Sequence, residues 1–343
     1  MGLFRKGNDG PFISKKDLTM HWDVEDPFMF VSHHTDDYPQ GNAQMAPPLR
    51  QISGRNLGRD YQVRFGFRMY NGKVVPGFPK HAHWGYETLT LPMLGWIDHF
   101  DSTGSNGRYG FGDVQWVSAP AMFQHSEMYP LVNQDSRNPN DITQIFVNLP
   151  LEEKNIEEPS VNTVWKENIP IVKGEKSRTM VICGEYGGKS IYSPSTHTWA
   201  RKENSVRILR TDLEAGGSFV LDPAPEDVNR NVYLLNGKGV TILGEPVKEY
   251  CKVKIDPTKE VEIKTSDVPA VVWVLEGKPI GQKMASFGPI TLSTEQEVRE
   301  SLNVLRRTEF ESWPWDLVDK ANPVDSGRFL RRADGTVVVP PEK

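Results

Sequence analysis

Two short pairs of metal-binding residue types, separated by forty-one residues, constrain this chain more than any other feature of its sequence. The first pair is His81-Ala82-His83 and the second is His125-Ser126-Glu127. Side chains at positions i and i+2 of a β-strand point to the same face, so each pair can aim both side chains into one cavity. Two such strands brought together would place three imidazoles and one carboxylate around one point. This donor set suits a divalent first-row metal, namely iron, manganese, nickel, copper or zinc.

Short alternating segments bounded by turn residues dominate the rest of the sequence. Residues 64–70 alternate and end at Asn71-Gly72, which is a hairpin signal, and residues 142–149 alternate again. The compact apolar segment 271–275 is typical of a buried strand. Regular turns between short strands favour a sandwich or a barrel. We therefore predict an all-β fold.

One helix is predicted over residues 294–307. It begins with a capping box, Thr294-Glu295-Gln296-Glu297, in which the hydroxyl and the second glutamate satisfy open backbone amides. Val298, Leu302 and Leu305 follow on one apolar face. We expect this face to pack against a barrel.

Composition excludes several classes of protein. A length of 343 residues predicts about two domains. The net charge is −5 and no basic block is present, so we expect no direct nucleic-acid binding. No apolar run approaches the roughly 20 residues that span a bilayer. Residues 1–6 lack a following apolar core, so we predict no signal peptide and a cytoplasmic or nuclear location.

The chain has two cysteines, Cys183 and Cys251, without a short metal-binding spacing. We expect buried thiols in a reducing compartment, and a disulfide between them is the alternative. The carboxyl-terminal residues 316–343 are polar, and their function is not readable from sequence. They either add an edge strand or lie loosely on the surface.

Further motifs surround the two metal-type pairs. They are Phe78-Pro79-Lys80-His81-Ala82-His83-Trp84-Gly85-Tyr86-Glu87-Thr88, Asp101-Ser102-Thr103-Gly104, Gly112-Asp113-Val114-Gln115-Trp116, His125-Ser126-Glu127-Met128, Asp26-Pro27-Phe28 and Phe287-Gly288-Pro289-Ile290. In order, spacing and chemistry they resemble the motifs of the pirin family, which belongs to the cupin superfamily. The resemblance covers roughly residues 20–310 and is more specific in the first half than in the second.

The resemblance implies a bicupin, with two cupin β-sandwich barrels in tandem and a C-terminal helix. Residues 1–150 would form the metal-binding barrel, and residues 151–176, rich in Glu, Lys, Asn and Pro, the linker. Residues 177–315 would form the second barrel with the helix, followed by the extension 316–343. Because the second barrel has one histidine, His197, and no His-x-His pair, we expect it to hold no metal.

The resemblance also implies the metal ligands. In pirins the metal is usually iron, and the matching ligands here are His81, His83, His125 and Glu127; manganese, nickel, copper and zinc remain alternatives. Glu87 fits the general cupin pattern His-x-His-x3-Glu, so it is either the alternative carboxylate ligand or a residue that orients a histidine.

Glu127 is a candidate catalytic base as well as a candidate ligand, because it could swing away from the metal when a substrate docks. His99 lies near a turn, and we expect it to be solvated rather than a further ligand.

Two functional hypotheses follow from the resemblance. One is a metal-dependent dioxygenase, of the quercetin 2,3-dioxygenase type, that acts on a flat aromatic flavonol. The other is a non-enzymatic, iron-dependent redox sensor that binds a protein partner such as a transcription regulator. Residues 120–124 replace the usual Gly-rich turn of pirins with Pro-Ala-Met-Phe-Gln, so we expect a narrower access to the metal. The sequence leaves open whether the chain is an enzyme.

Overall fold

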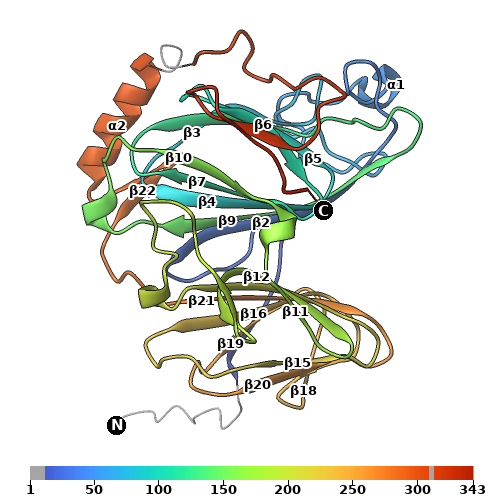
Figure 1. The fold of residues 1–343 in the computed structure, drawn as a ribbon, viewed down its shortest axis with the longest axis vertical. Coiled ribbons are helices and arrows are strands. Elements are labelled where there is room, and N and C mark those ends of the chain that lie inside the picture. The colour runs from blue at the N-terminus through green and yellow to red at the C-terminus, as the bar shows by residue number, and fades with distance from the viewer. Residues whose placement is uncertain (1–11, 309–312, 343) are drawn as a thin grey trace, which may run out of the picture. The chain divides into compact units, whose positions relative to one another are not determined.

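A computed structural model describes residues 12–308 and 313–342. Its contacts divide the chain into two compact units, both built mainly of strands (Figure 1). The first comprises residues 32–168, 194–198 and 282–343, and we call it the histidine unit. The second comprises residues 1–31, 169–193 and 199–281, and we call it the second unit. This organisation confirms the all-β prediction.

Two sheets pack face to face in the histidine unit. Their inward side chains share one apolar core, with Ile97 and Phe123 from one sheet and Val117 and Ile142 from the other. The six-stranded sheet has the order β25 (Val337–Val338), β24 (Phe329–Arg331), β6 (Asn106–Gly110), β5 (Trp96–Asp101), β8 (Phe123–Met128), β3 (Gly77–His83), and the five-stranded sheet has the order β10 (Ser160–Val164), β7 (Val114–Ala119), β4 (Tyr86–Leu94), β9 (Asn138–Asn148), β2 (Phe28–Tyr38).

The second unit repeats this sandwich. Val232, Val253 and Val274 of the larger sheet meet Phe219 and Ile263 of the smaller one. The larger sheet has the order β1 (Phe12–Asp17), β19 (Cys251–Ile255), β16 (Asn229–Asn236), β21 (Ala270–Gly277), β14 (Arg207–Leu213), β12 (Ser177–Tyr186), β11 (Ile171–Lys173), with β13 (Lys189–Ile191) paired to β12, and the smaller has the order β15 (Ser218–Leu221), β20 (Val261–Lys264), β17 (Val240–Ile242), β18 (Glu245–Val247).

Each unit is assembled from separate stretches of the chain. The expected domain boundaries at 150 and 176 stay a prediction. β1, the first strand of the described residues, pairs with β19 of the second unit. The expected linker 151–176 contains β10, which pairs with β7, and β11, which pairs with β12. Each of these strands hydrogen-bonds to a neighbour that would otherwise present an open sheet edge.

The predicted helix is confirmed as α2 (Glu295–Thr308). Thr294 Oγ1 accepts a hydrogen bond from the Glu297 amide at 3.2 Å, and the Glu297 carboxylate accepts one from the Ser293 amide at 3.0 Å. Val298 packs against β23 (Ile290–Leu292), which forms a hairpin with β22 (Ala285–Phe287) beside the helix (Figure 1). The other helical segments among the described residues are α1 (Leu49–Ile52), η1 (Leu151–Glu153), η2 (Lys166–Asn168) and η3 (Lys202–Asn204).

The predictions about the cysteines, membrane-spanning segments and residues 1–6 have different outcomes. Cys183 and Cys251 are both buried and no disulfide joins them, which confirms the prediction of buried thiols. Within the described ranges, no helix combines the length and apolar character that crossing a bilayer requires. The prediction about residues 1–6 falls outside the described residues.

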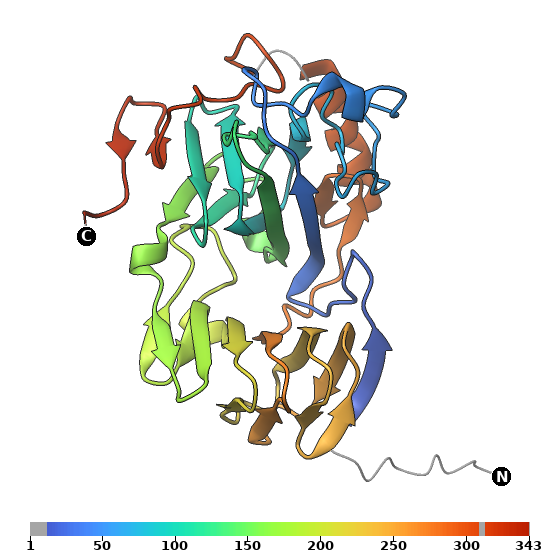
Figure 2. The same cartoon turned by 90° about the vertical axis from the view of Figure 1, so that its right-hand side faces the viewer.

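The carboxyl-terminal extension adds an edge to the histidine unit. β24 pairs with β6, and Figure 2 shows the red strands of the extension at the edge of the teal strands of this unit. Next to this pairing the fully buried Arg108 donates to both oxygens of Asp98, at 2.7 and 2.8 Å. The same guanidinium donates to carbonyls of the extension, those of Asn322, Pro323, Val324 and Ser326. Arg108 therefore holds the extension against the barrel.

We predict that Arg108→Met destabilises the protein by about 3–5 kcal/mol, because a buried carboxylate loses its counter-charge. Burial raises the pKa of Asp98 while Arg108 opposes that rise, so acidic conditions that protonate Asp98 should relieve part of the loss. Urea unfolding measures the change. Arg331→Met is the matched control, since Arg331 is exposed on β24 and its loss should cost under about 0.5 kcal/mol. Equal midpoints for the two variants would contradict the assignment.

Candidate metal centre

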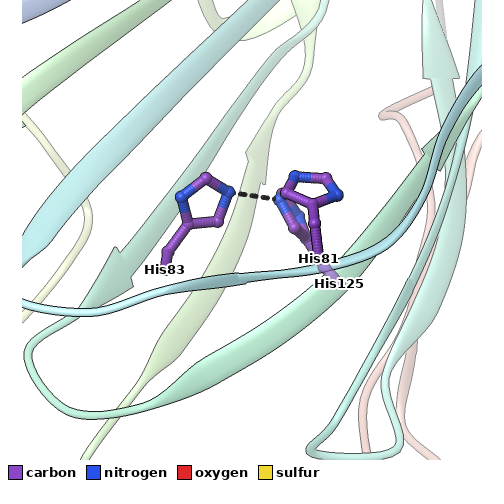
Figure 3. Close-up of side chains that lie close together, drawn as sticks. All are labelled: His81, His83 and His125. Atoms are coloured by element: carbon purple, nitrogen blue, oxygen red, sulfur yellow. Dashed lines mark hydrogen bonds between the residues drawn. The ribbon is translucent and has the colours of Figure 1, made fainter. Parts of the chain in front are cut away.

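The two metal-type pairs lie on adjacent strands of the six-stranded sheet. β3 pairs antiparallel with β8, and His81 stands directly opposite His125. His83 and His125 are buried, whereas the side chain of His81 keeps 32% of its exposure. The three imidazole rings converge from the two strands (Figure 3). The strand alternation inferred from the sequence therefore brings these three side chains together.

The spacing of the three rings suits a single ion. The Nε2 atoms of His83 and His125 are 2.8 Å apart, and the ring centres of His81 and His125 are 4.5 Å apart. One nitrogen from each ring lies within 4.8 Å of the others. Two nitrogen ligands at about 2.0–2.1 Å from a metal and at right angles to each other would be about 3 Å apart. The group could therefore hold one metal ion.

Glu127 faces the same point from β8. Its Oε2 atom lies 3.6 Å from His125 Nε2 and 3.8 Å from His81 Nε2. Thr90 Oγ1 donates to Oε1 at 3.1 Å, and Gln144 Nε2 donates to Oε2 at 2.9 Å. Both donors belong to the five-stranded sheet, so the two sheets together orient this carboxylate. The assignment of Glu127 as fourth ligand stays a prediction.

Glu87 lies on the other sheet of the sandwich. It is fully buried on β4, and its Oε2 accepts a hydrogen bond from Thr198 Oγ1 at 2.5 Å. The cluster of candidate ligands found among the described residues consists of His81, His83 and His125. The role of Glu87, as alternative ligand or as a partner that orients a histidine, stays a prediction.

The Nδ1 atoms of His81 and His83, which point away from the common point, each have a hydrogen-bond partner. His83 Nδ1 lies 2.7 Å from the hydroxyl of Tyr86, and His81 Nδ1 lies 3.0 Å from the carbonyl oxygen of Pro79. A proton on Nδ1 serves both bonds and leaves the Nε2 lone pair directed at the common point. The carbonyl of Pro79 can only accept, so it selects this tautomer for His81.

Burial also keeps the three imidazoles neutral. It lowers the pKa of His81, where the Glu127 carboxylate acts in the opposite direction. It lowers the pKa of His83 and of His125 well below the usual value, and His81 adds to the effect at both. A neutral imidazole is the form that binds a metal. The structure thus prepares three lone pairs for a cation.

Sequence reasoning was wrong about His99, which it placed in solvent. His99 is fully buried on β5, opposite Glu127, and its ring centre lies 5.3 Å from that of His125. Its Nε2 atom pairs with Asp101 Oδ2 at 2.8 Å. β5 lies between β6 and β8, so alternate side chains of this strand point into the sandwich despite the nearby turn.

Three side chains that support the site were missed by the sequence analysis: Tyr86, Thr90 and Gln144. Tyr86 lies within the first motif, but its spacing from His83 does not distinguish it as a partner. Thr90 and Gln144 lie on strands in which apolar and polar residues alternate, and this pattern indicates which side chains point into the sandwich. That pattern does not say which ligand each one meets across the sandwich.

Two strand sandwiches, one of them with three inward imidazoles, define a bicupin with a candidate metal site in one barrel. The Pirin domain model matches residues 15–147, and the Pirin C-terminal cupin domain model matches residues 208–311. The chain belongs to the pirin family. This confirms the family and the bicupin architecture predicted from the motifs.

Named relatives match this chain along most of their own length. The chain is 29% identical over 241 residues to "Putative quercetin 2,3-dioxygenase PA2418" of Pseudomonas aeruginosa, covering 68% of this chain and 79% of that protein. It is 29% identical over 260 residues to Pirin-like protein At1g50590 of Arabidopsis thaliana, covering 70% and 80%. A crystal structure of quercetin 2,3-dioxygenase from Acinetobacter baumannii has the same fold, with a TM-score of 0.67 at 20% identity over 87% of this chain and 97% of that one.

We predict that Tyr86→Phe weakens metal binding about 10- to 100-fold, because His83 loses the partner that orients it. Competition with a chromogenic chelator measures the affinity. Tyr250→Phe is the control, since Tyr250 is exposed and belongs to the second unit. An affinity unchanged in Tyr86→Phe would show that the hydroxyl does not tune the ligand.

Proposed function

We propose that this chain is a metal-dependent dioxygenase that acts on a chelating enol, with quercetin-like flavonols as the first substrates to test. The observation that carries the proposal is the convergence of three neutral imidazoles with the Glu127 carboxylate beside them. Relatives with the printed name "Putative quercetin 2,3-dioxygenase" support the substrate class. Iron is the metal we propose, and manganese, nickel, copper and zinc suit the same donors.

The protein would hold the metal with His81, His83 and His125, and with Glu127 as the fourth ligand. Three neutral imidazoles and one carboxylate leave a net charge of +1 on a divalent cation. The bound metal would supply Lewis acidity toward a hydroxyl and electrons for oxygen chemistry. His81 is the exposed member of the group, so substrate would approach from its side.

Glu127 is the proposed proton acceptor. A flavonol hydroxyl must lose its proton to become an electron-rich enolate, and Glu127 Oε2 lies beside His81, on the side of approach. Thr90 and Gln144 hold the carboxylate in place without neutralising its charge. A carboxylate so positioned can take the proton as the substrate docks.

Replacement of His83 by alanine should abolish both metal retention and oxygen consumption with quercetin, because the group loses one of its three nitrogens. Elemental analysis and an oxygen electrode give the two readouts. His197→Ala is the control, since that histidine lies outside the group and near Glu153 and Glu158. Metal-loaded native protein that leaves quercetin and related enols untouched would remove the proposal.

For Glu127→Gln we expect a loss of about 10²-fold or more in kcat, since the amide cannot accept the proton. The amide oxygen keeps the shape of the side chain, so three histidines should still retain metal when the cation is in excess. Steady-state kinetics with parallel metal analysis separates the two effects. Full activity in this variant would exclude Glu127 as the base.

A further inference from the structure

Lys154 is a buried lysine of the histidine unit, directly after η1, and only 6% of it is exposed. Its ammonium donates hydrogen bonds to three oxygens, which are the Gly85 carbonyl, Asn148 Oδ1 at 2.9 Å and the Thr291 carbonyl at 3.0 Å. An ammonium has three N–H donors, so the donors and these acceptors are equal in number. All four residues belong to the same unit.

The burial of this cation carries a free-energy cost. It lowers the pKa of Lys154 to about 7, because the ammonium loses its hydration and these three oxygens carry no net charge. An apolar side chain of similar size would fill the space without that cost. It would also leave the three oxygens without a donor. The contribution of Lys154 therefore lies in what it does to the groups that carry these oxygens.

One of these groups is the turn Trp84-Gly85, which joins His83 at the end of β3 to Tyr86 at the start of β4. His83 is one of the three imidazoles, and the Tyr86 hydroxyl lies 2.7 Å from its Nδ1 atom. Gly85 has a φ of +88°, and a Cβ atom there would lie 2.0 Å from the Thr291 carbonyl oxygen. The turn thus approaches β23 too closely for any residue with a side chain.

Backbone contacts join the same turn to β23. The Trp84 amide donates to the Pro289 carbonyl, and the Trp84 carbonyl accepts from the Thr291 amide, both at 2.9 Å. The carbonyl oxygens of Gly85 and Thr291 converge on one nitrogen atom, that of Lys154. Converging carbonyl oxygens repel each other, and a cation between them offsets the repulsion. Lys154 therefore stabilises the close approach of the turn to β23.

We propose that Lys154 is a positioning residue of the candidate metal centre, which fixes the turn Trp84-Gly85 and thereby the direction of the His83 imidazole. His83 and Tyr86 flank the turn, so a shift of the turn moves both side chains. A metal site tolerates changes of only about 0.2 Å in the distances to its ligands. The inference rests on the proposed function, since it concerns the same centre.

Metal binding to variants of the full-length protein tests the inference. Lys154→Met removes the three donors and keeps an unbranched side chain, and Lys154→Gln has a similar length but retains two N–H donors. Competition with a chromogenic chelator gives the zinc affinity, and the visible absorption of bound cobalt(II) reports the geometry of its ligands. The titrations are made below pH 7, where Lys154 is a cation.

We expect Lys154→Met to weaken zinc binding about 3- to 10-fold and to shift the cobalt spectrum, because the His83 imidazole loses its fixed direction. Lys154→Gln should lie between this variant and the native protein. Lys166→Met is the matched control and should leave both readouts unchanged, since Lys166 is exposed on η2 of the same unit. Leu330→Ala lowers stability through a cavity beneath β24, and it too should leave both readouts unchanged.

A double-mutant cycle with Tyr86→Phe separates positioning from a purely structural role. Both Lys154→Met and Tyr86→Phe act through the direction of one imidazole, that of His83. The loss of zinc affinity in the double variant should therefore be about threefold or more below the product of the two single losses. A lysine that only stabilises the fold would give the full product.

The outcomes separate the two claims. Native zinc affinity with a native cobalt spectrum in folded Lys154→Met would overturn the inference, and so would a full product in the cycle. If Lys154→Met does not fold, Lys154→Gln decides, and native behaviour of that variant overturns the inference. Zinc binding that depends on Lys154, in a protein that consumes no oxygen with any enol, would remove the proposed dioxygenase and leave the role of Lys154 standing. Native protein that binds neither zinc nor cobalt would overturn both.

Discussion

The pairing of β3 with β8 is the constraint on which the candidate centre depends. It sets His81 opposite His125 and carries His83 and Glu127 to the same inner face. A slip of one residue would turn one strand's pair to the other side of the sheet and separate the ligands. β8 also has β5 as its second neighbour, so hydrogen bonds on both edges hold the register.

The second sheet of the sandwich completes the centre rather than simply covering it. Tyr86 orients His83, and Thr90 and Gln144 orient Glu127. Because the apolar core fixes how the two sheets face each other, these polar contacts are positioned by packing. The same burial keeps the imidazoles neutral and ready for a cation. The packing of the two sheets thus sets both the positions of the candidate ligands and the protonation state of the imidazoles.

Much of the fold could be predicted from the sequence, and so could most of the site. The strand pattern, the capped helix and the inward pairs are local features, since each depends on residues a few positions apart. The grouping of segments was not predictable in the same way. β1 and β24 extend sheets formed by distant parts of the chain, and edge pairing through backbone hydrogen bonds leaves little trace in side-chain composition.

The sequence by itself determined which side chains share one face of a strand or helix, because alternation and helical periodicity are intrinsic to the backbone. For that reason it paired His81 with His83, and His125 with Glu127. Only the tertiary structure decided what lies opposite each face. It buried His99 against the group, and it set Thr90 and Gln144 of the opposite sheet against Glu127. Such meetings arise from packing between elements, which no local pattern encodes.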